Sequence, residues 1–174
     1  MTERNGRIAL LGLGNLMRSD DAVGMLTVRN LAADGRLLDV VRVIEGETLG
    51  LDLIDSFAGI SQLLAIDAVD IGAPPGTLVR FAGQELTGLP VSKSVHLLGF
   101  SDLINVLLLM GAAPTEIVLL GVQPASTDWG TSLTPAVESA RKKLAEAAMR
   151  QIAEWAGAPP DHKPSLFRST AFAR

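Results

Sequence analysis

Three side chains able to bind a metal stand at comparable places in this sequence of 174 residues. Asp21 lies in the first turn of a predicted helix just after a strand, Asp67 lies near the end of another strand, and His96 begins a later helix. Two carboxylates and one neutral imidazole form an incomplete ligand set for a divalent cation, with open positions for water or a substrate group. We expect this set to be too weak for a permanent ion and to suit an ion that another molecule partly holds.

Each of these residues also has a structural interpretation. Asp20 and Asp21 would stabilise the positive end of a helix dipole by roughly a few tenths of a kcal/mol. A single histidine at a helix start, such as His96, more often has a structural role than a ligand role. Asp67 is harder to explain in this way, because it ends an apolar run and a buried carboxylate requires donors, a cation or a cavity. The metal interpretation therefore depends on the three side chains lying together.

The composition excludes several other kinds of chemistry. The chain has no cysteine, which excludes disulfides, thiolate zinc sites and cysteine nucleophiles. One of its two histidines, His162, lies in a proline-rich tail, so imidazole chemistry within the domain depends on His96. The patterns HExxH and GxSxG, typical of zinc peptidases and of many hydrolases, are absent.

Nucleic acids and nucleotides are also poor candidates for a ligand. The net charge of −4 argues against a nucleic-acid surface, which would need clustered Lys and Arg. Gly12 and Gly14 begin a dinucleotide-binding pattern, but its third glycine would fall on Met17. Acidic residues at the next helix start would also repel a pyrophosphate.

A membrane location is not expected either. The longest apolar region, 103–122, is interrupted by Asn105, Pro114, Thr115 and Glu116, so it is not a spanning helix. The N-terminal residues do not resemble a signal peptide. We therefore expect a cytoplasmic protein that does not bind membranes.

The elements that must position these residues alternate between strands and helices. Buried strands followed by helices predict an α/β fold, a three-layer sandwich whose five-stranded sheet is mostly parallel and has helices on both faces. The link between the third and fourth strands is too short for a helical crossover, which predicts one antiparallel strand. The expected strands are 7–13, 38–44, 62–69, 77–81 and 116–122, and the expected helices are 22–32, 50–58, 95–110 and 134–156.

Further details follow from the local pattern. Thr48 and Ser94 are candidate caps for two of the helices, and Gly111 stands where a helix-ending glycine belongs. The helix 95–110 is apolar nearly all round, so we expect it to be deeply buried. We expect one domain, 1–157, and a mobile tail, 158–174.

In such sheets ligands bind beyond the carboxyl ends of the strands. This rule brings Asp21, Asp67 and His96 to one edge, together with the segment Glu45-Gly46-Glu47-Thr48 that follows the second strand.

Five blocks of this sequence, spread over about residues 7–155, resemble the signature of the hydrogenase maturation protease family, and they occur in the family's order. Each block alone is a weak signal, but five in order are a strong one. The blocks are Gly12-x-Gly14-Asn15-x(4)-Asp20-Asp21-Ala22-x-Gly24, Asp67-Ala68-Val69-Asp70 followed by Pro75-Gly76, Ser94-x-His96-x-x-Gly99, Gly121-Val122-Gln123-Pro124 and Leu133-Thr134-Pro135.

The resemblance implies an endopeptidase that removes the C-terminal extension of a nickel-loaded [NiFe]-hydrogenase large-subunit precursor. In that family the residues matching Asp21, Asp67 and His96 bind the nickel carried by the precursor and are required for the cut. The nickel is thus supplied by the substrate, although other divalent ions could occupy the site in vitro. The family cuts after a basic residue just beyond the metal-binding cysteine motif of the large subunit, and it is often classed with the aspartic peptidases.

One block departs from the family. The family usually has Asp-Gly-Gly-Thr after the second strand, where this chain has Glu45-Gly46-Glu47-Thr48. We interpret Glu45, Glu47 and Thr48 as substrate-binding residues and the change as a difference in which hydrogenase is served. A non-catalytic, metal-dependent binding module or chaperone for hydrogenase assembly is the alternative that this departure leaves open. In either case we expect a monomer.

Overall fold

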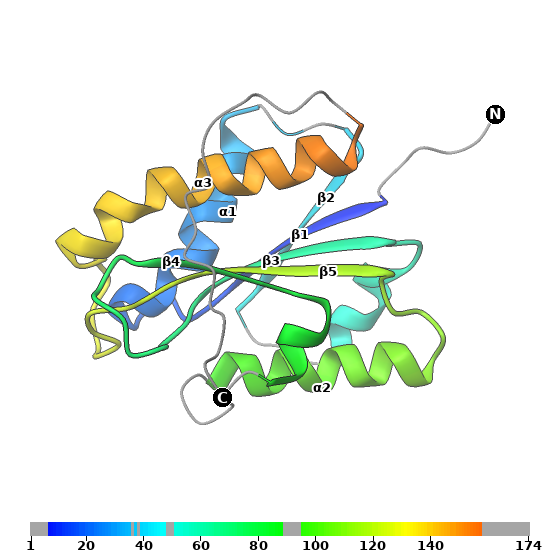
Figure 1. Cartoon of the computed structure of the whole chain (residues 1–174), viewed down its shortest axis with the longest axis horizontal. Helices are drawn as coiled ribbons and strands as arrows, with labels where there is room; N and C mark the ends of the chain where they lie inside the picture. Colours follow the sequence, from blue (N-terminus) through cyan, green and yellow to red (C-terminus); the bar gives the residue numbers. More distant parts are fainter. Residues whose placement is uncertain (1–6, 36, 38, 48–50, 89–94, 158–174) are drawn as a thin grey trace.

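The computed structural model describes residues 7–157, apart from 36, 38, 48–50 and 89–94, and it leaves the side chains of 51–52, 84, 87–88 and 95–99 undescribed. Five strands form one sheet in the order β2-β1-β3-β5-β4 (Figure 1). β1, β2, β3 and β5 are parallel, and β4 runs antiparallel to β5. The predicted mixed sheet, with its one antiparallel strand, is confirmed. The strands are β1 (Ile8–Leu13), β2 (Val41–Gly46), β3 (Gln62–Ala68), β4 (Leu78–Ala82) and β5 (Glu116–Val122).

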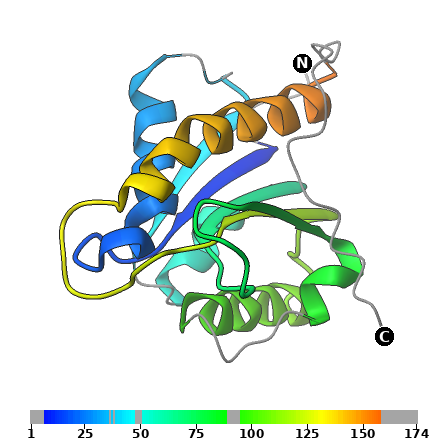
Figure 2. The same cartoon turned by 60° about the vertical axis from the view of Figure 1, so that its left-hand side comes forward.

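Helices cover both faces of the sheet, as Figures 1 and 2 show. Alternate strand residues such as Leu10 and Leu64 pack on one face, which α1 (Val23–Ala33) and α3 (Pro135–Trp155) cover. The residues between them, such as Leu11 and Leu63, pack on the other face against α2 (Val95–Leu109) and two 3₁₀ helices, η2 (Leu51–Phe57) and η3 (Gly83–Gly88). Because both faces are buried, the central strands are continuous apolar runs.

Two predicted elements differ in extent or type. β2 begins at Val41 rather than at residue 38, because Val41 pairs with Ile8, the first residue of β1, and the ladder has no earlier partner. The segment predicted as a short helix over 50–58 is the 3₁₀ helix η2. The proposed caps Thr48 and Ser94 lie outside the described residues.

The expectation that α2 is deeply buried is wrong for its last turn. Leu103 and Leu107 are buried against the sheet, but Leu109 is 88% exposed. The helix packs on the sheet through Leu103 and Leu107, so the leucines at its end, Leu108 and Leu109, remain in solvent. Gly111 does end the helix with a positive φ of 66°, as predicted.

Two expectations about the whole chain have no structural test. The predicted tail, 158–174, lies outside the described residues, and the single-domain boundary at 157 stays a prediction. None of the helices among the described residues is long and apolar enough to cross a membrane.

The start of α1 is seated directly on the ends of two strands. A Cβ atom at Gly24 would lie 2.2 Å from the carbonyl oxygen of Ile66 and 2.3 Å from that of Leu13. Backbone on both sides leaves no room for a side chain, so this close approach requires glycine. The 3₁₀ turn before α1, η1 (Ser19–Ala22), is thereby held against the end of β3.

Candidate functional site

Two of the predicted ligands lie at the carboxyl edge of the sheet, the edge where the parallel strands end. Asp21 is in η1 and is 8% exposed, whereas Asp67 is the second-last residue of β3 and is completely buried. η1 contacts β3, and Ile66, next to Asp67, is in register with Gly12 of β1. The backbone therefore brings the two carboxylate-bearing segments together, as the strand-end rule predicts.

Asp67 faces the layer that contains α2. Its side chain has the same parity along β3 as Leu63 and Ala65, which belong to the hydrophobic cluster on that face. One carboxylate oxygen, Oδ1, accepts a hydrogen bond of 2.8 Å from the N–H of Ala68. Asp67 is thus a buried carboxylate on the face of the sheet that α2 covers.

His96 lies in the first turn of α2, and its side chain is outside the description. After α2 the chain returns to the amino edge, where the N–H of Thr115 donates to the carbonyl of Ser61, just before β3. A helix of 15 residues is about 22 Å long, similar to a seven-residue strand, so α2 begins at the carboxyl edge. The backbone thus carries His96 to the same edge and layer as Asp67.

The three-ligand set itself stays a prediction. Among the side chains that the structure describes, no three His, Cys, Asp or Glu residues form a group that could hold a metal. The predicted set includes His96, whose side chain is not among them. The grouping of Asp21, Asp67 and His96 therefore rests on the positions of their backbones in the fold and on the chemistry of their side chains.

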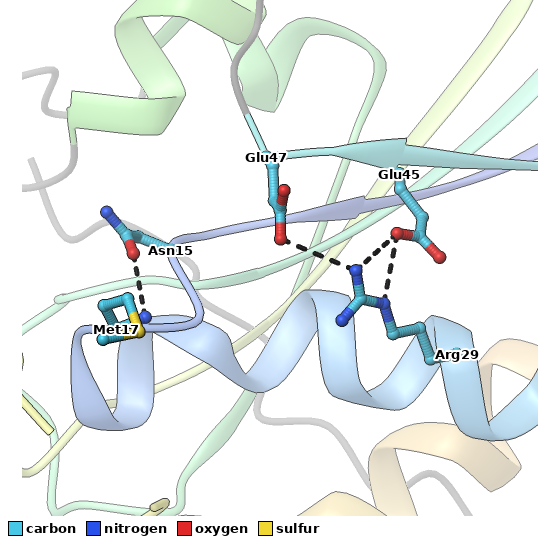
Figure 3. Close-up of polar contacts among 5 residues, drawn as sticks. All are labelled: Asn15, Met17, Arg29, Glu45 and Glu47. Carbon is cyan, nitrogen blue, oxygen red and sulfur yellow. Dashed lines mark hydrogen bonds and ion pairs between the residues drawn. The ribbon is translucent and has the colours of Figure 1, made fainter. Parts of the chain in front are cut away.

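The loop before η1 fixes the position of Asp21. The N–H of Asn15 donates to Asp21 Oδ2 at 3.0 Å. Asn15 Oδ1 in turn accepts from the N–H of Met17 at 2.9 Å, as Figure 3 shows. Gly14 has a φ of 118°, and a Cβ atom there would lie 1.7 Å from the carbonyl oxygen of Asp21. Gly14 and Asn15 of the first sequence block thus allow the backbone to pack closely against Asp21.

Asp20 has a role that the sequence analysis did not predict. It is completely buried, and its carboxylate accepts hydrogen bonds from the loop between β5 and α3 rather than stabilising its own helix end. The donors are the N–H groups of Ala125 (2.8 Å), Ser126 (3.1 Å) and Thr134 (2.6 Å) and the hydroxyl of Thr134 (2.8 Å). Figure 2 shows this loop, in yellow, beside the blue turn that carries Asp20. The two adjacent aspartates therefore differ in role, since Asp20 anchors a loop, whereas Asp21 stays a predicted ligand.

A buried glutamine, Gln123, organises the turn that follows β3. Its Oε1 accepts hydrogen bonds from the N–H groups of Ile71 and Ala73, and its Nε2 donates to Asp70 Oδ1. The turn beside Asp67 is thus fixed by a residue at the end of β5. The sequence feature that could have indicated this role is the position of Gln123 directly after an apolar strand, where a buried polar side chain needs hydrogen-bond partners inside the protein.

Glu45 and Glu47 both lean toward Arg29 of α1, as Figure 3 shows. Arg29 Nη2 lies 2.7 Å from Glu45 Oε2 and 3.5 Å from Glu47 Oε1. The hydrogen bond from Arg29 lowers the pKa of Glu45 below its ordinary value of 4.5, and the same bond raises the pKa of Arg29. Two carboxylates share one guanidinium, so this half-exposed cluster keeps a net negative charge. Thr48, the third predicted substrate-binding residue, lies outside the described residues.

Comparison with known proteins points to one family. The family model described as hydrogenase maturation protease matches residues 25–151, a range that includes Asp67 and His96 and begins just after Asp21. The hydrogenase expression/formation protein HupD of Rhodobacter capsulatus is 35% identical over 152 residues, which are 86% of this chain and 72% of that protein. The hydrogenase 2 maturation protease of Escherichia coli is 34% identical over 84% of this chain and 88% of its own length.

Solved structures agree. The hydrogenase maturating endopeptidase HybD of E. coli superposes with a TM-score of 0.79 at 31% identity, covering 87% of this chain and 94% of that one. The [NiFe] hydrogenase maturation protease HybD of Thermococcus kodakarensis gives a TM-score of 0.72 at 27% identity, covering 84% and 99%.

The substitution Asp20→Asn is expected to destabilise the fold by about 3 kcal/mol, because an amide NH₂ group would face backbone N–H donors inside the protein. Urea denaturation measures this loss. Asp128→Asn, the same change on an exposed residue of the same loop, is the control and should cost less than about 1 kcal/mol. Equal stability of the two variants would contradict the anchoring role of Asp20.

A second prediction concerns pH. Since the pKa of Glu45 is lower in the folded protein, its ion pair with Arg29 stabilises the fold above about pH 4.5, and this contribution is lost as the pH falls through the folded pKa. At pH 7, Glu45→Gln should lower Tm by no more than about 3 °C, as expected for an exposed pair. As the pH falls through the folded pKa of Glu45, the difference in Tm between the variant and the original chain should shrink towards zero. Thermal melts over a series of pH values from 7 downwards test this, with Glu146→Gln on α3 as the control. A Tm difference for Glu45→Gln that does not shrink as the pH falls would refute it.

Proposed function

This chain belongs to the hydrogenase maturation protease family and is a peptidase, and from that premise we propose that it removes the C-terminal extension of a nickel-loaded [NiFe]-hydrogenase large-subunit precursor. The observation that carries the proposal is the placement of two buried carboxylates at one edge of the sheet. Asp21 comes from η1 and Asp67 from β3, and Asp67 faces the layer in which His96 begins α2.

In this proposal the nickel is part of the substrate. Asp21, Asp67 and His96 supply an oxygen, oxygen and nitrogen set that fills positions which the precursor's own ligands leave open. A partial set binds well when the substrate contributes the remaining ligands, and a nickel-free precursor loses the bridging interaction. Recognition of the metal would thus ensure that only a loaded large subunit is cut.

The cleavage step requires water. A water oxygen bonds to the scissile carbonyl carbon, the amide C–N bond breaks, and one proton from that water reaches the departing nitrogen. A carboxylate at the site can accept the proton from water and deliver it to the nitrogen. Water positioned by the substrate's metal is the other route compatible with the same residues.

The glutamate cluster supports a further part of the proposal. Glu45 and Glu47 carry two negative charges against the single positive charge of Arg29, and each glutamate side chain is about half exposed. A surface with this charge suits the basic residue after which the family cuts. We assign Glu45 and Glu47 to substrate binding on this basis, and we assign Thr48, which lies outside the described residues, from its place in the same sequence block.

The first test compares nickel-loaded and nickel-free forms of the large-subunit precursor in a gel-shift assay. The loaded form should be shortened and the nickel-free form should stay intact, because the site lacks enough ligands without the bound ion. Equal cleavage of both forms would refute metal-dependent recognition. Mass spectrometry for the released peptide separates a peptidase from a non-catalytic binding module, which would bind the loaded precursor and release nothing.

The second test addresses the assigned residues. Asp21→Asn, Asp67→Asn and His96→Ala should each reduce processing by about 100-fold or more, since each removes a ligand or a proton carrier. Circular dichroism should show an intact fold, and Asp55→Asn, which changes an exposed aspartate of η2 before the start of β3, should process normally. Normal processing by any of the three variants would remove that residue from the site.

A further inference from the structure

Two large apolar side chains are exposed beside the candidate site. Trp129 is 77% exposed and Met17 is 54% exposed. Isolated apolar residues are common on protein surfaces, so exposure alone means little here. These two residues, however, lie on segments that the fold joins together, and we call them the Met17–Trp129 surface.

The backbone holds these two residues level with each other. Arg18 and Gly130, the residues that follow them, form an isolated parallel β-bridge. The N–H of Gly130 donates to the carbonyl of Met17 at 3.0 Å, and the N–H of Ser19 donates to the carbonyl of Gly130 at 2.8 Å. Gly130 suits this bridge, since a Cβ atom there would lie 2.6 Å from Ser19 Oγ.

The tryptophan ring is also held from the side. The Arg18 guanidinium lies 5.6 Å from the ring centroid of Trp129, within the range of a cation–π interaction. Arg18 Nε donates to the carbonyl of Thr127 at 3.0 Å, which keeps the guanidinium in place. The buried carboxylate of Asp20 anchors the same loop at Ala125, Ser126 and Thr134, on both sides of Trp129. The loop that carries the exposed indole is therefore anchored on both sides, and the Arg18 guanidinium lies beside the ring.

Strain accompanies this arrangement. Ser19 has a φ of 43°, the left-handed conformation, and it is the one non-glycine residue with positive φ in the part of the chain that the structure describes. Such a conformation is unfavourable for a residue other than glycine and persists where the surrounding contacts determine it. Ser19 lies between Arg18 of the bridge and the Asp20–Asp21 pair, so the strained residue connects the exposed surface to the site.

We propose that the Met17–Trp129 surface binds apolar side chains of the protein substrate next to the segment that is cut. This inference rests on the proposed function. Continuity supports it, because Met17 lies in the turn just before η1 and only four residues before Asp21. A fixed tryptophan loses little conformational entropy on binding, and tryptophan often dominates the binding energy of interfaces.

The size of the surface favours this occupant over a second copy of the chain. A tryptophan and a methionine expose on the order of 300 Å² together, whereas a stable dimer buries about 800 Å² on each partner. A small, rigid apolar surface beside a candidate active site fits one or two side chains of an extended segment.

The experiment measures KM and kcat for the nickel-loaded precursor with Trp129→Ala and Met17→Ala. Trp129→Ala should raise KM about tenfold or more and Met17→Ala by a smaller factor, with kcat within about twofold, because the contact is made equally before and during the reaction. Leu109→Ala, which removes an exposed leucine at the far end of α2, is the matched control and should change neither value.

The outcomes separate this inference from the proposed function. If the original chain does not cleave the precursor, the proposed function fails. If it cleaves and Trp129→Ala leaves KM unchanged, or lowers kcat alone, the inference is overturned while the function stands. Sedimentation of the original chain and of Trp129→Ala tests the other occupant, since a dimer that the substitution dissociates would assign the surface to self-association and overturn the inference as well.

Discussion

The close approach of α1 to the ends of β1 and β3 is the constraint on which the site depends. Gly24 lies against the carbonyl groups of Leu13 and Ile66, and Gly14 lies against the carbonyl group of Asp21. Neither position has space for a Cβ atom, so the backbone of the η1 turn is pressed onto the carboxyl edge of the sheet. The η1 turn, which carries Asp21, can therefore lie against the end of β3, the strand that carries Asp67, because these two glycines leave out the side chains that would hold the segments apart.

The neighbouring aspartates show how one short turn can serve two purposes. Asp20 is completely buried, and N–H groups of a loop distant in sequence donate hydrogen bonds that compensate for the burial of its charge. Asp21 keeps a small exposed fraction and accepts one backbone hydrogen bond from Asn15. Asp20 anchors the η1 turn, and this turn positions Asp21, the predicted ligand.

Much of this fold could be predicted from the sequence, for physical reasons that are local. Strands such as β1 and β3 are buried on both faces and are therefore apolar throughout, and Gly111 ends α2 because a left-handed residue is needed there. The start of β2 could not be predicted from its valines, because it depends on where β1 begins. The exposed last turn of α2 was missed because an apolar sequence does not reveal how many neighbours a helix has.

The candidate site was predictable in part for the same reason. A strand-end aspartate is a local signal, and it led to Asp67. The partners of Asp20 are more than 100 residues away in the sequence, at Ala125, Ser126 and Thr134, and no local pattern pairs them. Arg29 resembles any other surface residue of a helix until the register of β2 against β1 places Glu45 opposite it.

The two tryptophans lie at opposite ends of the sheet, and this has a practical consequence. Trp129 stands in solvent at the carboxyl edge, whereas Trp155, at the end of α3, donates its indole N–H to Glu116 at the start of β5. The chain contains no tyrosine, so these two indoles dominate its near-ultraviolet signal. Intrinsic fluorescence therefore carries two spatially separate reporters, one beside the candidate site and one remote from it, without any added label.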